Sequence, residues 1–377
     1  MHVVVAPDKF KGSLTAREVA ERVAAGFAAF DPELDVVQVP VADGGDGTVD
    51  AALAAGYERI PRRATGPTGE PVDTAYAVRD DVAVVEMADV SGLRLLPPDR
   101  LAPLTATSYG TGEVIAAALD RGARHVVLGI GGSASTDGGA GMLEALGVRL
   151  YDAVGNPLPR GGGALADLHR VDLSGLHPAV AGARIVVACD VDNPLLGPHG
   201  AAAVYGPQKG ASLDDVIALD VALAHWADLV DAATGRTGVR DRAGAGAAGG
   251  VGYAAMAVLA AELEPGIGLI LDLVRFDDQL PGADLVVTGE GSLDEQTLHG
   301  KAPAGVASAA GKAGVPVVAV SGRLALDRAQ LRAAGIEAAY ALTDIEPDVR
   351  RCIADAGPLL EKLAQGLARE RIGGTTP

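Results

Sequence analysis

Residues 129–141 read GIGGSASTDGGAG, with six glycines among thirteen positions. They follow the apolar run 125–128, which is typical of a buried strand, and they precede a short helix that we predict over residues 142–146. Glycines let a backbone approach a ligand closely, and the N–H groups of a loop ahead of a helix are suited to an anion. The stretch therefore predicts a phosphate-binding loop. The alternative is a turn that needs glycine only for its geometry.

Polar side chains in this loop add to the same chemistry. The hydroxyl groups of Ser133, Ser135 and Thr136 are hydrogen-bond donors. The carboxylate of Asp137 can face a metal ion or a substrate hydroxyl.

The composition indicates an acidic α/β protein of about two domains. The chain has 377 residues, of which 49% are hydrophobic and only 3% aromatic, so Ala, Val, Leu and Gly must fill the core. The formal net charge of -18 disfavours binding to nucleic acid or to an anionic membrane, and no basic patch stands out. A small anionic substrate is still compatible with this charge, because a few lysines in a cleft can outweigh the overall field.

The cysteines and the apolar segments predict a cytoplasmic protein. Cys189 and Cys352 lie far apart and form neither a disulfide framework nor a zinc-site spacing. The apolar run 3–6 is too short for a signal peptide. The uncharged stretch 243–261 has the length of a membrane span, but its glycines and alanines indicate a glycine-rich loop that enters a buried helix.

Both ends of the chain show the pattern of a parallel sheet. A capping box at Thr15 and Glu18 predicts the start of a helix between two β-branched runs, which together form a βαβ unit. The other expected elements are strands over 3–5, 35–39, 285–287 and 315–320 and a helix over 303–313. We therefore predict one doubly wound α/β domain with a parallel sheet, formed by residues 1–61 and 281–377.

The middle of the chain differs from its ends. Residues 72–78 and 82–87 alternate apolar and polar side chains around the short polar turn 79–81, which predicts a β-hairpin. A second α/β domain is therefore expected over residues 62–280, inserted into the first.

Polar side chains gather where the predicted strands end. In an open parallel sheet, ligands bind beyond the carboxyl ends of the strands. The candidates in these segments are Asp8, Lys9, Lys11, Ser13, Asp43, Asp46, Asp190, Asp192, Lys209, Glu290, Asp294, Lys301 and Arg323. Lysines act as point charges toward phosphate, and paired carboxylates can hold Mg²⁺. Together they predict a cleft suited to phosphoryl transfer, although each segment alone could be an ordinary solvated loop.

Six long motifs follow one another along the chain: APDKFKGSLTA, PVADGGDGT, GIGGSASTDGGAGM, ACDVDNPLLGPHGAA, GPQKGA and TGEGSLDEQTLHGKAP. In this order they resemble the bacterial glycerate kinase family of type I, over residues 1–323. The resemblance implies phosphorylation of D-glycerate with ATP and Mg²⁺, giving 2-phosphoglycerate, with 3-phosphoglycerate the less expected product. It also implies a flavodoxin-like domain and a mixed-sheet, restriction-endonuclease-like domain, with the active site in the cleft between them.

For this reaction, the clustering of charged residues at the strand ends suggests roles for the candidate residues. The expected ATP-binding residues are Gly131, Gly132, Ser133, Ser135 and Lys209. The expected catalytic residues are Lys9 or Lys11, which would neutralise phosphate charge, and Asp137 or Asp294 as the general base. The expected residues around glycerate are Asp8, Ser13, Glu290, Lys301 and Arg323. The expected Mg²⁺ ligands are Asp190 and Asp192, or else Asp43 and Asp46.

Two other functions are compatible with the residues. The pattern Gly129-x-Gly131-x-x-Ala134, with Asp152 following 18 residues after Ala134, fits the fingerprint of an NAD(P)-dependent oxidoreductase, here one that acts on a small hydroxy acid. The glycines that continue through Gly141 weaken this alternative. The other alternative is a non-catalytic protein that binds a sugar acid.

For the oligomeric state, either a homodimer or a monomer is expected.

Overall fold

The computed structural model describes residues 1–373 of the chain, which form two compact units. The terminal unit consists of Met1–Asp43, Asp50–Gly56 and the residues from Ile267 onward. The central unit consists of Gly44–Val49 and Tyr57–Gly266.

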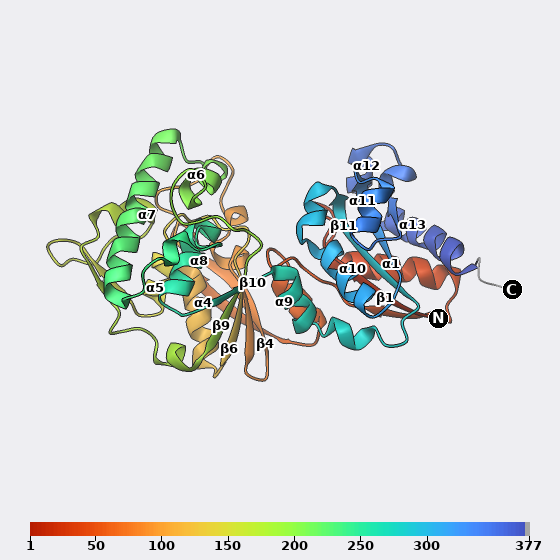
Figure 1. Cartoon of the computed structure of the whole chain (residues 1–377), viewed down its shortest axis with the longest axis horizontal. Helices are drawn as coiled ribbons and strands as arrows, with labels where there is room; N and C mark the ends of the chain where they lie inside the picture. The colour runs from red at the N-terminus through yellow and green to blue at the C-terminus, as the bar shows by residue number, and fades with distance from the viewer. Residues whose placement is uncertain (374–377) are drawn as a thin grey trace. The chain divides into compact units, whose positions relative to one another are not determined.

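The terminal unit is built on a parallel sheet of five strands (Figure 1). Its strands are β1 (His2–Pro7), β2 (Asp35–Gln38), β11 (Leu285–Leu293), β12 (Val317–Leu324) and β13 (Ala338–Ala341). Their order in the sheet is β13-β12-β11-β1-β2, so strands from both ends of the chain pair in the middle of the sheet. This is the flavodoxin-like order, and it confirms the predicted doubly wound parallel sheet.

Helices cover both faces of this sheet. The helices of this unit are α1 (Ala16–Phe30), α2 (Thr48–Ala54), α9 (Gly266–Leu273), α10 (Ala302–Lys312), α11 (Arg328–Ala333), α12 (Val349–Ala354) and α13 (Ala356–Arg371). Helix α1 begins at the predicted capping box, in which the Thr15 hydroxyl accepts the N–H of Glu18. Helices α1 and α13 pack together on the face to which Val3 and Val5 point, and α10 packs against β11 and β12. A Cβ atom on Gly26 of α1 would lie 2.4 Å from the carbonyl oxygen of Glu361, so only glycine allows α1 and α13 to lie this close.

Two strands of the terminal unit run further than the sequence predicts. The predicted strand 285–287 continues to Leu293, and the predicted strand 315–320 continues to Leu324. Their polar residues stay extended because β11 and β12 pair with each other along this length, from Val286↔Val317 to Leu293↔Leu324. Glu290 and Arg323 therefore lie inside strands and not in the loops that follow them.

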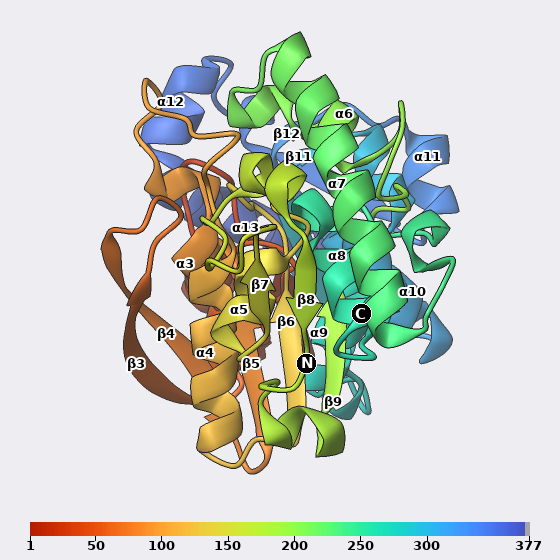
Figure 2. The same ribbon diagram turned by 90° about the vertical axis from the view of Figure 1, so that its left-hand side faces the viewer.

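The central unit is built on a mixed sheet of six strands (Figure 2). Its strands are β3 (Glu58–Thr65), β4 (Pro71–Arg79), β5 (Val82–Glu86), β6 (His125–Gly129), β9 (Arg184–Ala188) and β10 (Glu262–Glu264), in the order β10-β9-β6-β5-β4-β3. Strands β4 and β5 form the predicted antiparallel hairpin, and β3 also pairs antiparallel with β4. The remaining pairs, β5 with β6, β6 with β9 and β9 with β10, are parallel. A separate small ribbon joins β7 (Arg149–Tyr151) to β8 (Arg170–Asp172).

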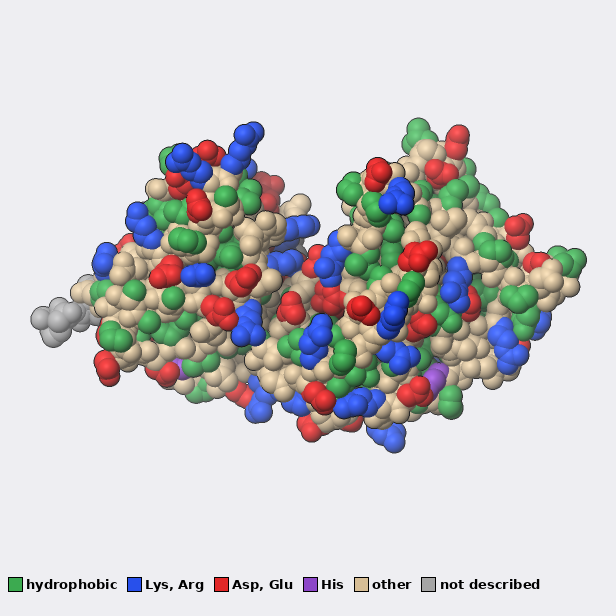
Figure 3. Space-filling model, turned by 180° about the vertical axis from the view of Figure 1, so that it is seen from behind, with side chains coloured by type: hydrophobic (Ala, Val, Ile, Leu, Met, Phe, Trp, Pro, Cys, Tyr) green, Lys and Arg blue, Asp and Glu red, His purple; other side chains and the backbone are tan. Residues whose placement is uncertain are grey.

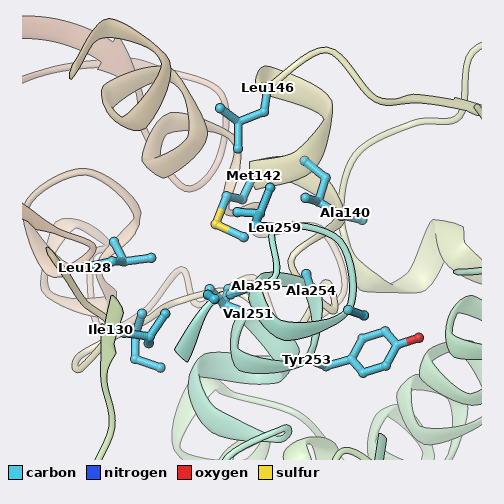
Figure 4. Close-up of a cluster of buried hydrophobic side chains, with 14 of the residues drawn as sticks. Leu128, Ile130, Ala140, Met142, Leu146, Val251, Tyr253, Ala254, Ala255 and Leu259 are labelled. Carbon is cyan, nitrogen blue, oxygen red and sulfur yellow. The ribbon is translucent and has the colours of Figure 1, made fainter. Parts of the chain in front are cut away.

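The helices of the central unit bury a large apolar core. They are α3 (Ala88–Ser91), α4 (Tyr109–Asp120), α5 (Ala140–Ala145), α6 (Ala201–Tyr205), α7 (Leu213–Thr234) and α8 (Ala247–Ala257). Leu128 and Ile130, at the end of β6 and just after it, lie in this core with Met142 of α5 and Val251 of α8 (Figure 4). The uncharged stretch 243–261 thus supplies a buried helix, as predicted, and no helix in the described part of the chain is long and apolar enough to span a membrane.

Charged side chains of both signs are interspersed on the surface that Figure 3 shows. Some ion pairs join two exposed side chains, for example Arg17 with Glu21. Exposed pairs of this kind contribute little to stability, so the charges of interest are the buried ones at the carboxyl ends of the strands.

Candidate functional site

The topological switch point of the terminal unit lies between β1 and β11. From β1 the chain moves through α1 to β2, on one side, whereas from β11 it moves through α10 to β12, on the other. In such open sheets the loops diverge at this point and leave a crevice at the carboxyl ends of the strands, where ligands bind. Asp8 follows β1 and Glu290 lies near the end of β11, so both carboxylates are at this crevice.

Asp8 is a buried carboxylate, only 5% exposed. Its Oδ1 atom accepts a hydrogen bond from the backbone N–H of Lys9 at 2.7 Å and lies 3.6 Å from Nζ of the same lysine. Burial, together with the charges of Asp43 and Glu290, raises the pKa of Asp8 to about 7 against the opposing effect of Lys9. A carboxyl group that titrates near neutral pH is suited to accept a proton.

Glu290 is also buried, but it is held from two sides. The hydroxyl of Thr297 donates a hydrogen bond to Oε1, and Nζ of Lys301 lies 3.7 Å from Oε2. Burial raises the pKa of Glu290, while the Thr297 hydroxyl and Lys301 oppose that effect. Glu290 therefore ties the segment around Thr297 and the start of α10 to the sheet.

The other predicted residues of the terminal unit are less enclosed. Asp294 is partly buried and accepts the N–H of Gln296 at 2.9 Å, which makes it the cap of a short 3-10 helix, η7 (Glu295–His299). The Ser13 hydroxyl donates to the carbonyl of Phe10. Lys11 and Arg323 are exposed.

In the central unit, the loop after β6 is exposed only at its tip. Gly132 is exposed and Gly131 partly so, whereas residues 133–137 are buried. A Cβ atom on Gly131 would lie 2.6 Å from the Cα atom of Gly45, so the loop packs backbone to backbone on residues 44–48. Within residues 1–373, the N–H groups of Gly131, Gly132 and Ser133 donate to no protein acceptor. Free N–H groups at a glycine-rich tip fit an anion.

Lys209 lies beneath this loop and not at its surface. Its side chain is 1% exposed, and Nζ donates to Oγ of Ser133 at 2.9 Å and to the carbonyl oxygen of Ser135 at 2.5 Å. Burial lowers the pKa of Lys209 to about 7, and Asp137 opposes this effect. Lys209 therefore holds the loop in shape by hydrogen bonds to it. This geometry does not favour direct contact between Lys209 and a phosphate.

Asp137 is fully buried and engaged by several donors. Its carboxylate accepts hydrogen bonds from the N–H of Ser108 at 2.8 Å, from the Ser108 hydroxyl at 2.9 Å, and from the N–H groups of Gly139 and Gly141 at 3.1 and 3.3 Å. A carboxylate with this many donors stabilises the start of α5 and has little capacity left to accept a substrate proton. A general base at Asp137 stays a prediction that this geometry does not favour.

The predicted metal ligands are spread over different segments. Oδ1 of Asp190 accepts the N–H of Gly266 at 2.8 Å, and Asp192 is exposed. Asp43 and Asp46 are both partly buried. Among residues 1–373, no group of three or more His, Cys, Asp or Glu side chains is arranged to hold a metal ion.

Glu86 is a buried carboxylate that is absent from the candidates predicted from the sequence. It ends β5 and accepts the N–H groups of Gly47 and Val49 at 3.0 and 3.1 Å, which fixes the segment 44–49 to the sheet. Burial raises its pKa to about 8, with contributions from Asp89 and Asp46. The sequence does carry a signal for Glu86, namely an acidic residue at the end of the apolar run 82–86. The alternating pattern of this run indicates only one strand of a hairpin, so it does not single out Glu86 as a site residue.

Comparison with known proteins agrees with the motifs that lie around these carboxylates and glycines. The model of the glycerate kinase family matches residues 3–371. The chain belongs to the glycerate kinase family. It is therefore an enzyme, a phosphotransferase, and the comparison gives no support to the oxidoreductase alternative.

Relatives in this glycerate kinase family match along nearly the whole chain. A glycerate kinase of Bacillus subtilis (strain 168) is 46% identical over 371 residues, which are 98% of this chain and 97% of the relative. A glycerate 2-kinase of Escherichia coli (strain K12) is 46% identical over 346 residues, 91% and 90% of the two chains. A crystal structure named for glycerate kinase 2 of Salmonella typhimurium LT2 superposes with a TM-score of 0.87 at 42% identity, covering 99% of both chains. The α/β fold with one parallel and one mixed sheet is thus shared with a solved member of the family.

Proposed function

We propose that this glycerate kinase family member transfers the γ-phosphate of ATP to the 2-hydroxyl of D-glycerate in an Mg²⁺-dependent reaction, giving 2-phosphoglycerate. The observation that carries the proposal is the pair of buried carboxylates, Asp8 and Glu290, at the switch point of the terminal unit beside Lys9 and Lys301. The relative named glycerate 2-kinase, at 46% identity, supports phosphorylation at the 2-position over the 3-position. Since ATP is the expected donor, a cytoplasmic location accords with the proposal.

The glycine tip of the central unit is the proposed site for the ATP phosphates. The unpaired N–H groups of Gly131, Gly132 and Ser133 supply donors there, within the part of the chain that the structure describes. The carbonyl oxygen of Ser135 accepts a hydrogen bond from Lys209, which helps to hold the shape of the loop. Transfer itself requires the phosphate and the accepting hydroxyl to approach within about 3–3.5 Å of each other.

The carboxylates present fit Mg²⁺ in donor type, since Mg²⁺ takes oxygen ligands and is bound by one or two carboxylates together with substrate phosphates. Asp43 and Asp46 supply one pair of carboxylates. Asp190 and Asp192 supply the other pair, although one oxygen of Asp190 already accepts the N–H of Gly266. When bound, the ion would offset phosphate charge.

Glycerate carries a carboxylate, for which the cationic side chains of the terminal unit are the proposed partners. Lys301 lies at the start of α10 and Lys9 follows Asp8, and both are partly exposed. Arg323, which is exposed on β12, is the alternative. Removal of the true partner should raise KM for D-glycerate more than KM for ATP.

The deciding experiment is phosphorus NMR of the reaction mixture with purified protein, ATP, Mg²⁺ and D-glycerate. The expected product is 2-phosphoglycerate, and formation should stop when a chelator removes the divalent ion. A signal from 3-phosphoglycerate would correct the position of transfer. An absence of any phosphoglycerate would overturn the proposed activity and favour a protein that only binds a sugar acid.

A further inference from the structure

Asp8, Glu290 and Ser321 form a row across three neighbouring strands of the terminal unit. Glu290 of β11 is the register partner of Ser321 of β12, so their side chains point to the same side of the sheet. Asp8 follows Pro7, whose register partner is Gly289, and its N–H donates to the carbonyl of Gly289 at 2.8 Å. The parallel ladder therefore continues the row from Glu290 to Asp8.

The Ser321 hydroxyl in this row has no protein partner within the described residues. Its side chain is 0% exposed, and its Oγ atom forms no hydrogen bond there. A buried hydroxyl without a partner costs free energy, and native proteins seldom keep one unless a ligand or a water molecule completes it. Because Ser321 shares its face with Glu290, the open hydroxyl points to the same place as the carboxylates.

The two carboxylates in the row are not equivalent. Glu290 is engaged by the Thr297 hydroxyl and faces Lys301. Asp8 uses only Oδ1, toward Lys9, and the described side chains and backbone offer no donor to its Oδ2 atom. Asp8 thus has an oxygen available for a substrate hydroxyl, whereas Glu290 is held in place by its own neighbours.

We propose that this row is the glycerate subsite, in which Asp8 is the catalytic base and Ser321 donates a hydrogen bond to the substrate. The inference rests on the proposed function. Oδ2 of Asp8 takes the proton as the O–H bond of glycerate breaks and an O–P bond forms to the γ-phosphorus of ATP. The bond between that phosphorus and the β,γ-bridging oxygen breaks, and ADP leaves with the bonding pair.

The surroundings of Asp8 agree with this role. Burial raises its pKa, Asp43 and Glu290 add to the effect, and Lys9 opposes it. The pKa of Glu290 is itself lowered by the charge of Lys301 and raised by that of Asp294. A carboxylate in such a setting is a stronger base than an exposed aspartate.

The test compares D8N, D8A and S321A with the wild type in steady-state kinetics with ATP and D-glycerate. Loss of a positioned base is expected to lower kcat about 10²- to 10⁴-fold with little change in KM for either substrate. S321A is expected to raise KM for D-glycerate about 3- to 10-fold and to leave KM for ATP unchanged, as for the loss of one hydrogen bond. The control E21Q removes an exposed carboxylate of α1 that pairs with Arg17, and it should keep wild-type kinetics.

Several outcomes would overturn the inference. One is a folded D8N enzyme with kcat within tenfold of the wild type, or with a raised KM alone. If neither Asp8 variant folds, S321A decides, since an unchanged KM for D-glycerate in a folded protein removes the row as the subsite. A wild type that makes no phosphoglycerate rejects the proposed function, whereas an active wild type with an active D8N rejects only the role of Asp8.

Discussion

Nζ of Lys209 lies 2.9 Å from Oγ of Ser133, so a buried ammonium group supports the glycine tip from below. The same nitrogen donates to the carbonyl of Ser135, which fixes the loop at two points. The two contacts join residues 76 and 74 positions apart in the sequence. The loop is therefore held in shape by the protein itself, which would lower the cost of ordering it when the proposed ATP phosphates bind.

Replacing Lys209 by methionine tests this support. K209M keeps most of the side-chain volume but leaves Ser133 and the Ser135 carbonyl without their donor. Hydrogen bonds to a charged group are worth about 1.5–3 kcal/mol, so KM for ATP should rise about tenfold or more, with KM for D-glycerate unchanged. Equal changes in both KM values, or none in a folded K209M protein, would contradict the assignment.

Asp137→Asn separates a structural carboxylate from a catalytic one. The substitution removes the negative charge that accepts hydrogen bonds from Ser108, Gly139 and Gly141. The free energy of unfolding should fall by about 1.5–3 kcal/mol in urea titration, while the loss in kcat of the folded enzyme stays smaller than the roughly 10²-fold typical of a lost base. If the turnover rate instead drops by about 10²-fold or more while stability is unchanged, Asp137 is restored as the base.

The pH dependence of stability should carry the signature of Asp8. Its carboxyl titrates at 3.8 ordinarily but at about 7 in the folded protein, so the folded state binds more protons between these values. The free energy of unfolding should therefore fall as pH rises through this window, and the stabilisation from protonated Asp8 is lost above about pH 7.

D8N isolates this contribution, because Lys209 and Glu86 also titrate near neutral pH and are present in both proteins. The free energy of unfolding of D8N relative to that of the wild type should therefore rise as the pH increases from about 4 to about 7 in urea titrations. A stability difference that does not vary with pH would mean that Asp8 is ionised throughout.

Gly131→Ala tests the contact between the glycine tip and the segment 44–48. The new Cβ atom would lie 2.6 Å from the Cα atom of Gly45, so backbone must move. We expect weaker ATP binding and a lower melting temperature. The matched control is G311A in α10, where a Cβ atom meets nothing within 4 Å and helix propensity should add up to about 1 kcal/mol. If G131A and G311A had equal melting temperatures and equal affinities for ATP, the loop would tolerate the added Cβ atom beside Gly45.

Elements specified by local sequence were predictable. The capping box at Thr15 and Glu18 and the hairpin of β4 and β5 depend on residues only a few positions apart, and both occur as predicted. The lengths of β11 and β12 were underestimated because their polar ends are extended only by pairing with each other. That pairing joins Glu290 to Ser321 across 31 positions and is invisible to a local pattern.

The sequence by itself determined the two α/β units in outline, the membership in a kinase family through its long motifs, and the segments in which charged side chains gather. Only the tertiary structure decided what each of these side chains does. Lys209 and Asp137 stand among polar residues of the sequence, yet both are buried and paired, while one oxygen of Asp8 has no donor among the described side chains and backbone. The physical reason is that burial and hydrogen bonding, which set the charge and the reach of a side chain, come from segments far apart in the chain and exist only once it has folded.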